Sequence, residues 1–166
     1  LCEVENERCL HDLCVRLKRF HYKYVHYDSP DERGIDVALL YDSTQVKVLN
    51  SKPLHVDLQG DNTRDILYTS VLIHGHDTLH TMVCHLPSVL GGETATEWKR
   101  YVSKQLIQQQ IDSILNLQPN AKIVVMGDMN CEPKNDLRGL NNMMIKQSGT
   151  EQGTHKYQGR WSCLDQ

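Results

Sequence analysis

The segment KIVVMGDMNCEP, residues Lys122–Pro133, combines the strongest strand signal of the chain with its most suggestive pair of polar residues. Its apolar, β-branched opening is typical of a strand buried on both faces. The apolar run stops at Gly127, and the proline at the end prevents the strand from continuing. Asp128 and Asn130 follow, and in an extended segment residues two positions apart point the same way. The pattern indicates either two polar groups leaving a buried strand side by side or an ordinary Asx turn.

The size and composition of the chain predict a folded globular domain. The 166 residues suffice for one domain with a real core, and 39% hydrophobic against 23% charged residues exclude a disordered chain. No apolar run is long enough to cross a membrane. The formal net charge of -3 lacks the basic footprint of a tight, non-specific nucleic-acid-binding protein. The six cysteines form no CxxC pair, and we expect most of them to be small buried hydrophobes.

Both ends of the sequence look incomplete. The chain begins at Leu1 without a start methionine, and Trp161–Gln166 resembles the beginning of a further strand. We therefore expect a piece of a longer protein, and the absence of a targeting segment leaves the compartment unknown.

Periodicity and turn residues predict an α+β domain whose consecutive strands form antiparallel hairpins covered by helices. A continuous parallel βαβ alternation, as in a Rossmann-like fold, is not indicated. The expected elements are a helix from Asn6 to about Phe20, strands at Tyr22–Tyr27, Ile35–Tyr41, Val46–Leu49, Arg64–His74 and Thr78–Leu86, and a long helix that ends near Leu117. The polar segment Ser51–Asn62 is expected to be a loop or to include a short edge strand.

The long helix carries two more specific expectations. Thr94 and Glu97 have the spacing of a capping box at its start. We expect its apolar side to consist of Trp98, Tyr101, Val102, Leu106, Ile111, Ile114 and Leu115.

Polar residues also end other predicted strands. Glu3 lies in Leu1–Val4, which is expected to be the end of a strand, and His85 ends Thr78–Leu86. Asp165 lies in the terminal strand, and Arg33 precedes Ile35–Tyr41. A hard divalent cation prefers carboxylate and amide oxygens, and a phosphate in transfer needs positive or hydrogen-bonding groups. The residue types therefore point to metal-assisted phosphate chemistry.

Five motifs in order resemble the endonuclease/exonuclease/phosphatase family, the Mg-dependent fold of deoxyribonuclease I, and in particular its bacterial branch. The motifs cover nearly the whole chain: LCEVEN at Leu1–Asn6, RGIDVALLY at Arg33–Tyr41, CHLPSVLGG at Cys84–Gly92, VVMGDMNCEP at Val124–Pro133 and WSCLDQ at Trp161–Gln166. The resemblance implies a four-layer α/β/β/α sandwich of two packed, mainly antiparallel sheets, here a single domain, residues 1–166, without its first strand and its C-terminal strands.

The resemblance also implies roles for individual residues. Glu3 would be the ligand of Mg²⁺, with Mn²⁺ as an alternative ion, and Asp128 would orient or deprotonate the attacking water. Asn130 and His85 would contact the phosphate, and Asp165 would buttress a histidine that comes later in the family. That histidine and the family's first strand are missing here, and Val89 stands where many relatives have an arginine.

Several residues keep a second interpretation. Arg33 could bind phosphate or be an ordinary surface arginine. Asp36 could pair with His85 and fix its orientation, or face solvent. His74, His76, His80 and His85 could suggest a zinc site, although a mostly exposed histidine-rich hairpin without metal is the simpler interpretation.

The sequence thus predicts a Mg-dependent phosphoester hydrolase, nuclease-like, whose substrate is a nucleic acid or a phosphorylated small molecule. Alternatives are a phosphatase acting on inositol phosphates or phospholipid headgroups, a catalytically silent binding module of the same fold, and a zinc-binding structural protein. No obligate protein partner is indicated.

Overall fold

The structure is a computed structural model that describes residues 1–131, 137–141, 155–157 and 160–162. It contains the helices α1 (Glu7–Arg16) and α2 (Glu93–Leu117) and the short 3₁₀ helix η1 (Lys18–Phe20). Its strands are β1 (Tyr22–His26), β2 (Ala38–Asp42), β3 (Val46–Leu54), β4 (Ile66–Ile73), β5 (Asp77–His85), β6 (Lys122–Asp128), β7 (His155–Tyr157) and β8 (Arg160–Ser162).

The main sheet has the strand order β3-β4-β5-β6. The pairs β3–β4 and β4–β5 are antiparallel, whereas β5 and β6 are parallel because α2 connects them. A second sheet consists of the antiparallel pair β1–β2, and β7–β8 forms a separate hairpin.

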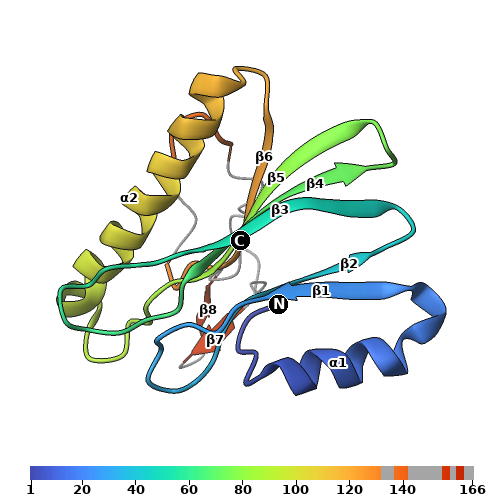
Figure 1. Cartoon of the computed structure of the whole chain (residues 1–166). Coiled ribbons are helices and arrows are strands. Elements are labelled where there is room, and N and C mark those ends of the chain that lie inside the picture. The colour runs from blue at the N-terminus through green and yellow to red at the C-terminus, as the bar shows by residue number, and fades with distance from the viewer. Residues whose placement is uncertain (132–136, 142–154, 158–159, 163–166) are drawn as a thin grey trace.

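Four layers follow one another in space, as Figure 1 shows: α1, the β1–β2 sheet, the main sheet and α2. Alternate residues of the buried strands point to opposite faces of the main sheet, one face toward β1–β2 and the other toward α2. Leu67 and Val83 pack with Val37 toward β1–β2, and Ile66 and Met82 pack toward α2. Two packed sheets with helices outside confirm the predicted α/β/β/α sandwich.

Helix α1 begins where the sequence predicts. The Asn6 side chain accepts a hydrogen bond from the backbone N–H of Cys9 at 3.2 Å, and Glu7 occupies the first turn. Only Leu10 of this helix is buried, and it packs with Val4 and Ala38. Val4 itself forms a single bridge with Asp36 and not a regular strand.

The prediction for the buried side of α2 was wrong in two respects. Trp98 and Tyr101 are 44% and 62% exposed, while Arg100 is buried among the apolar positions. Arg100 occupies the core side because backbone carbonyls of the segment after β5 and of the helix start accept its hydrogen bonds. The capping box is also absent, since Gly92 is the N-cap and no side chain caps the helix.

Strand β3 is an edge strand of the main sheet and extends to Leu54, so the start of the polar segment follows the edge-strand alternative and pairs with β4. The expectation for the cysteines needs correction. Of the cysteines in the described part of the chain, only Cys84 is buried, and Cys9 is exposed. Within the described residues, no helix is both long and apolar enough to cross a lipid bilayer.

Candidate active site

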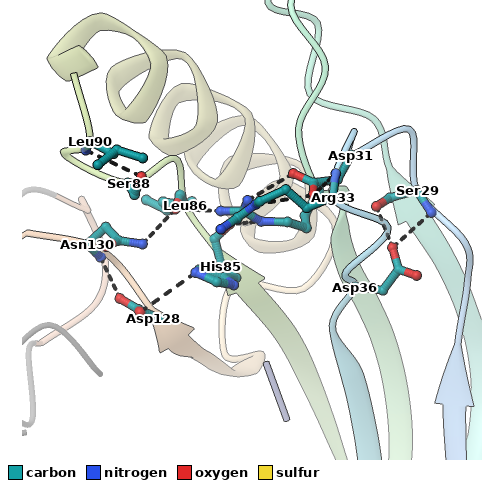
Figure 2. Close-up of polar contacts among 11 residues, drawn as sticks. Ser29, Asp31, Arg33, Asp36, His85, Leu86, Ser88, Leu90, Asp128 and Asn130 are labelled. Carbon is teal, nitrogen blue, oxygen red and sulfur yellow. Dashed lines mark hydrogen bonds and ion pairs between the residues drawn. The ribbon is translucent and has the colours of Figure 1, made fainter. Parts of the chain in front are cut away.

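The parallel pairing of β5 and β6 places His85 beside Asp128. The two residues are direct partners in the register, at the carboxyl ends of both strands. The backbone N–H of Leu86 donates to the carbonyl of Asp128 at 2.8 Å and continues the pairing past the strand ends. Figure 2 shows His85, Asp128 and Asn130 gathered at this edge of the main sheet.

Gly127 makes this close approach possible. Its φ is +136°, and a Cβ built on it would lie 1.9 Å from the carbonyl oxygen of Cys84. No side chain fits at that distance, so the glycine of the GDMN sequence is required by the backbone of the neighbouring strand.

Asp128 and Asn130 combine both interpretations that the sequence left open. The backbone N–H of Asn130 donates to Asp128 Oδ1 at 2.8 Å, which is the hydrogen bond of an Asx turn. Asn130 is left-handed, with φ 48°, so the two side chains are brought together by a turn and not by strand periodicity. Its Nδ2 donates to the carbonyl of Leu86 at 2.8 Å, which leaves one N–H of the amide for another acceptor.

The second carboxylate oxygen of Asp128 is directed at His85. Asp128 Oδ2 lies 3.7 Å from His85 Nε2, and the Asp128 side chain is 23% exposed. One oxygen therefore anchors the turn, while the other lies beside the imidazole on a partly exposed side chain.

His85 is held neutral by its surroundings. Its pKa is lowered to about 4, chiefly by burial and then by the positive charges of Arg64 and Arg33, against the opposing carboxylates of Glu3 and Asp31. Its Nδ1 has no hydrogen-bond partner among the described residues. At neutral pH the imidazole thus has one N–H and one lone pair to offer.

Arg33 lies at the exposed margin of this cluster. Its side chain is 54% exposed, and its Nε lies 3.6 Å from Asp31 Oδ1. The backbone N–H of Arg33 donates to the same oxygen at 3.1 Å. The position is compatible with either predicted role of Arg33, surface residue or phosphate ligand.

Sequence reasoning missed Arg64 and Asp31, which lie behind the cluster. Arg64 is only 4% exposed and forms an ion pair of 2.9 Å with the equally buried Asp31. Its Nε donates to the carbonyl of His85 at 3.1 Å. The only signal in the sequence was the position of Arg64 at the start of the predicted strand Arg64–His74, which does not identify its partners.

Glu3 reaches the site from the N-terminal segment. The thiol of Cys2 donates to the carbonyl of Cys84 at 3.5 Å, which places this segment beside the end of β5. Glu3 is exposed and adopts a left-handed backbone with φ 57°, a strained conformation for a residue other than glycine. Its carboxylate is a hard donor and fits Mg²⁺, which keeps several waters and needs only one or two carboxylates from a protein.

Another group of metal-ligand types lies elsewhere. His26, Asp28 and Asp36 have donor atoms within 4.8 Å of one another, and in the searched part of the chain no other such group was found. Asp36 Oδ1 already accepts the N–H of Ser29 at 3.0 Å and its hydroxyl, and Oδ2 lies 3.2 Å from His26 Nε2. These satisfied bonds join β1 to the loop that follows it.

This arrangement corrects both alternatives for Asp36, which is buried and bonded to His26 and Ser29, not to His85 or solvent. The histidine-rich hairpin forms no metal cluster over the described residues: His74 and His76 are exposed, and His80 is buried against the Tyr68 hydroxyl at 2.8 Å. The predicted site residue Asp165 lies outside the described residues.

A layered α/β/β/α fold with a histidine, a carboxylate and an amide at the ends of two parallel strands defines a class of phosphate-processing domains. Residues 1–166 match the model of the Endonuclease/Exonuclease/phosphatase family, and the chain belongs to that family. A comparison with curated proteins finds no significant match.

Solved structures show the same fold at low identity. The human Nocturnin catalytic domain with bound sulfate is 19% identical with a TM-score of 0.64, over 80% of this chain and 51% of that one. ANGEL2, a 2′,3′-cyclic phosphatase, is 14% identical with a TM-score of 0.66, over 80% and 39%. A Bacteroides thetaiotaomicron mannosyl-6-phosphatase is 15% identical with a TM-score of 0.61, over 80% and 50%. The chain thus spans about half or less of these structures' own length.

Proposed function

We propose that this domain belongs to a Mg-dependent hydrolase that attacks a phosphoester with water, in line with the leaving oxygen. The observation that supports the proposal most is the register of β5 and β6, which pairs His85 with Asp128, together with the turn that joins Asn130 to Asp128. Family membership supplies the class of reaction, and the site supplies the groups that the reaction needs.

Asp128 is the residue suited to the attacking water. Its side chain is partly exposed, and its Oδ1 is fixed by the N–H of Asn130, so the carboxylate has one defined orientation. In this position it accepts a hydrogen bond from water and takes its proton as the oxygen attacks phosphorus.

His85, Asn130 and Arg33 are suited to the phosphate oxygens. The second N–H of the Asn130 amide and one N–H of a neutral His85 are donors that are already oriented by the fold. Arg33, exposed at the margin, adds a positive charge that reaches an anionic substrate.

Glu3 would hold the metal ion of the site. When bound there, Mg²⁺, or Mn²⁺ in its place, supplies Lewis-acid stabilisation of the negative charge that develops on phosphate. The exposure of Glu3 and the negative charge that it exerts on His85 support this role for its carboxylate.

The substrate is proposed only as a class, a phosphoester of a nucleic acid or of a phosphorylated small molecule or lipid headgroup. ANGEL2 is a 2′,3′-cyclic phosphatase and the Bacteroides protein a mannosyl-6-phosphatase, so more than one kind of phosphoester is cleaved by proteins of this fold. The net charge of -3 favours substrates that do not rely on a large basic surface.

A substrate panel tests the proposal. The natural chain that carries these residues is incubated with DNA, RNA, inositol phosphates and bis-p-nitrophenyl phosphate, with Mg²⁺ or with EDTA. We expect Mg²⁺-dependent cleavage of at least one class. Binding of these ligands without any cleavage would instead support the silent binding module.

A further inference from the structure

Two buried arginines bind four successive backbone carbonyls, beginning at the last residue of β5. Arg64 donates from Nε to the carbonyl of His85 at 3.1 Å and from Nη2 to that of Leu86 at 2.9 Å. Arg100 donates from Nη1 to the carbonyls of Pro87 and Ser88 at 3.2 and 3.3 Å. The main chain from 85 to 88 is therefore fixed from the β4 side and from α2.

Arg64 differs from Arg100 in its third partner. Its Nη1 donates to Asp31 Oδ2 at 2.9 Å, and the other oxygen of Asp31 accepts the backbone N–H of Arg33 at 3.1 Å. Asp31 neutralises the buried guanidinium, which would be costly without a partner. The pair thereby ties the loop of Arg33 to the end of β5.

The carbonyl of Leu86 connects Arg64 to the other side of the site. This oxygen accepts from Arg64 at 2.9 Å and from the Asn130 amide at 2.8 Å. Displacement of the carbonyl would shift the Asn130 amide, and displacement of the neighbouring peptide would turn the His85 imidazole.

We infer that Arg64, held by Asp31, is a positioning residue that fixes the placement of the His85 imidazole and the Asn130 amide through the backbone between them. Arg64 is not a group that touches substrate, because it is 4% exposed and its Nε, Nη1 and Nη2 all bind protein acceptors. The kinetic consequence rests on the proposed hydrolase function, whereas the structural consequence does not.

Lysine cannot replace Arg64 in this role. A planar guanidinium reaches two successive carbonyls and a carboxylate at once, while an ammonium is a point charge that keeps the positive sign but loses the fork. Arg64→Lys therefore separates geometry from charge. Arg100→Lys is the matched control, since it removes another buried fork from the same segment, two residues further along.

The test combines NMR with kinetics on the natural chain. The side-chain amide signal of Asn130 and the ring signals of His85 are identified by their loss in Asn130→Gly and His85→Gln. In Arg64→Lys we expect both sets of signals to move and kcat to fall roughly 10- to 100-fold, with KM changed less than about threefold. In Arg100→Lys we expect a comparable loss of melting temperature, unmoved signals and kcat within about twofold of wild type.

Unmoved Asn130 and His85 signals in a folded Arg64→Lys protein would overturn the inference, as would equal movement in Arg100→Lys. If Arg64→Lys does not fold, Asp31→Asn is the second variant, because asparagine keeps the size of the Asp31 side chain. The Asn130 and His85 signals should then move in Asp31→Asn. If wild-type protein cleaves no phosphoester while the signals still respond to Arg64→Lys, the proposed function fails and the positioning role stands.

Discussion

His85 faces Asp128 across the parallel pair of β5 and β6, with 3.7 Å between His85 Nε2 and Asp128 Oδ2. The distance exceeds that of a hydrogen bond, and catalytic contacts of this kind commonly tighten only when substrate is bound. The imidazole and the carboxylate are thus neighbours, and the imidazole can still donate to a phosphate oxygen while the carboxylate can still accept from a water.

Asn130→Gly should abolish the amide while keeping the turn. Glycine adopts the left-handed backbone of Asn130 without strain, so the fold should survive. We expect kcat to fall on the order of a hundredfold, because a donor aimed at the transition state is lost. Melting temperature and steady-state kinetics measured together check this, and unchanged kcat in a stable protein would reduce Asn130 to a turn former.

His85 should make folding stability depend on acid pH. Its pKa is about 4 in the folded protein and near 6.5 when unfolded, so between these values the unfolded chain binds more protons. Stability should rise with pH across this window, by up to about 1.4 kcal/mol per pH unit from this one residue. The contribution of His85 to the free energy of unfolding should be fully present above the pKa of the unfolded chain and should be lost as pH falls toward 4.

Urea unfolding between pH 4 and 7 measures this slope. His85→Gln should reduce this dependence of stability on pH. His55→Gln, at an exposed histidine beside Asp65, is the control and should retain most of the wild-type slope. Equal slopes in wild type and His85→Gln would show that His85 is not held neutral by the fold.

Glu3→Gln should weaken the response to Mg²⁺. A neutral amide is a poor substitute for a hard anionic ligand, so we expect the half-saturating Mg²⁺ concentration to rise roughly tenfold or more. Glu5→Gln, two residues along and also exposed, is the control and should behave as wild type. The same Mg²⁺ titration curve for all three proteins would remove Glu3 from the metal site.

Gly127→Ala should destabilise the main sheet. Its Cβ would meet the Cys84 carbonyl at 1.9 Å, so β5 and β6 would have to separate, at a cost of about 3 kcal/mol or more. Gly60→Ala has a similarly positive φ but open space around the new Cβ, and about 1 kcal/mol is expected there. Chemical denaturation of both variants separates the cost of backbone strain from the cost of the steric clash. Similar losses of unfolding free energy in the two variants would contradict the close approach of Gly127 to the Cys84 carbonyl.

The local signals in the sequence were sufficient for the strands that build the site. The apolar run before Gly127, and the alternating strand that ends at His85, both lie where they were predicted, and their parallel register produces the cluster. The family's two packed sheets with helices outside were also predicted correctly.

Side chains whose burial depends on distant backbone could not be predicted. Arg64 and Arg100 are buried because carbonyls from another element accept their hydrogen bonds, and hydrophobic periodicity assigns charged residues to the surface. The same limit misplaced Trp98 and Tyr101 on the core side of α2. The partner of Asp36 was likewise decided by a loop conformation that brings Ser29 and not His85 to its carboxylate.

The central claim is that Asp128 activates water in a Mg²⁺-dependent attack on a phosphoester. The most direct measurement is the rate of bis-p-nitrophenyl phosphate hydrolysis by the natural chain, with wild type, Asp128→Asn and Asp57→Asn compared in Mg²⁺ and in EDTA. Asp57 accepts the N–H of Gln59 at 2.8 Å in the same kind of turn outside the cluster, so its variant controls for loss of an Asx carboxylate. We expect Mg²⁺-dependent hydrolysis that Asp57→Asn retains and that Asp128→Asn lowers about a hundredfold or more at unchanged melting temperature. Equal rates in wild type and Asp128→Asn would contradict the account.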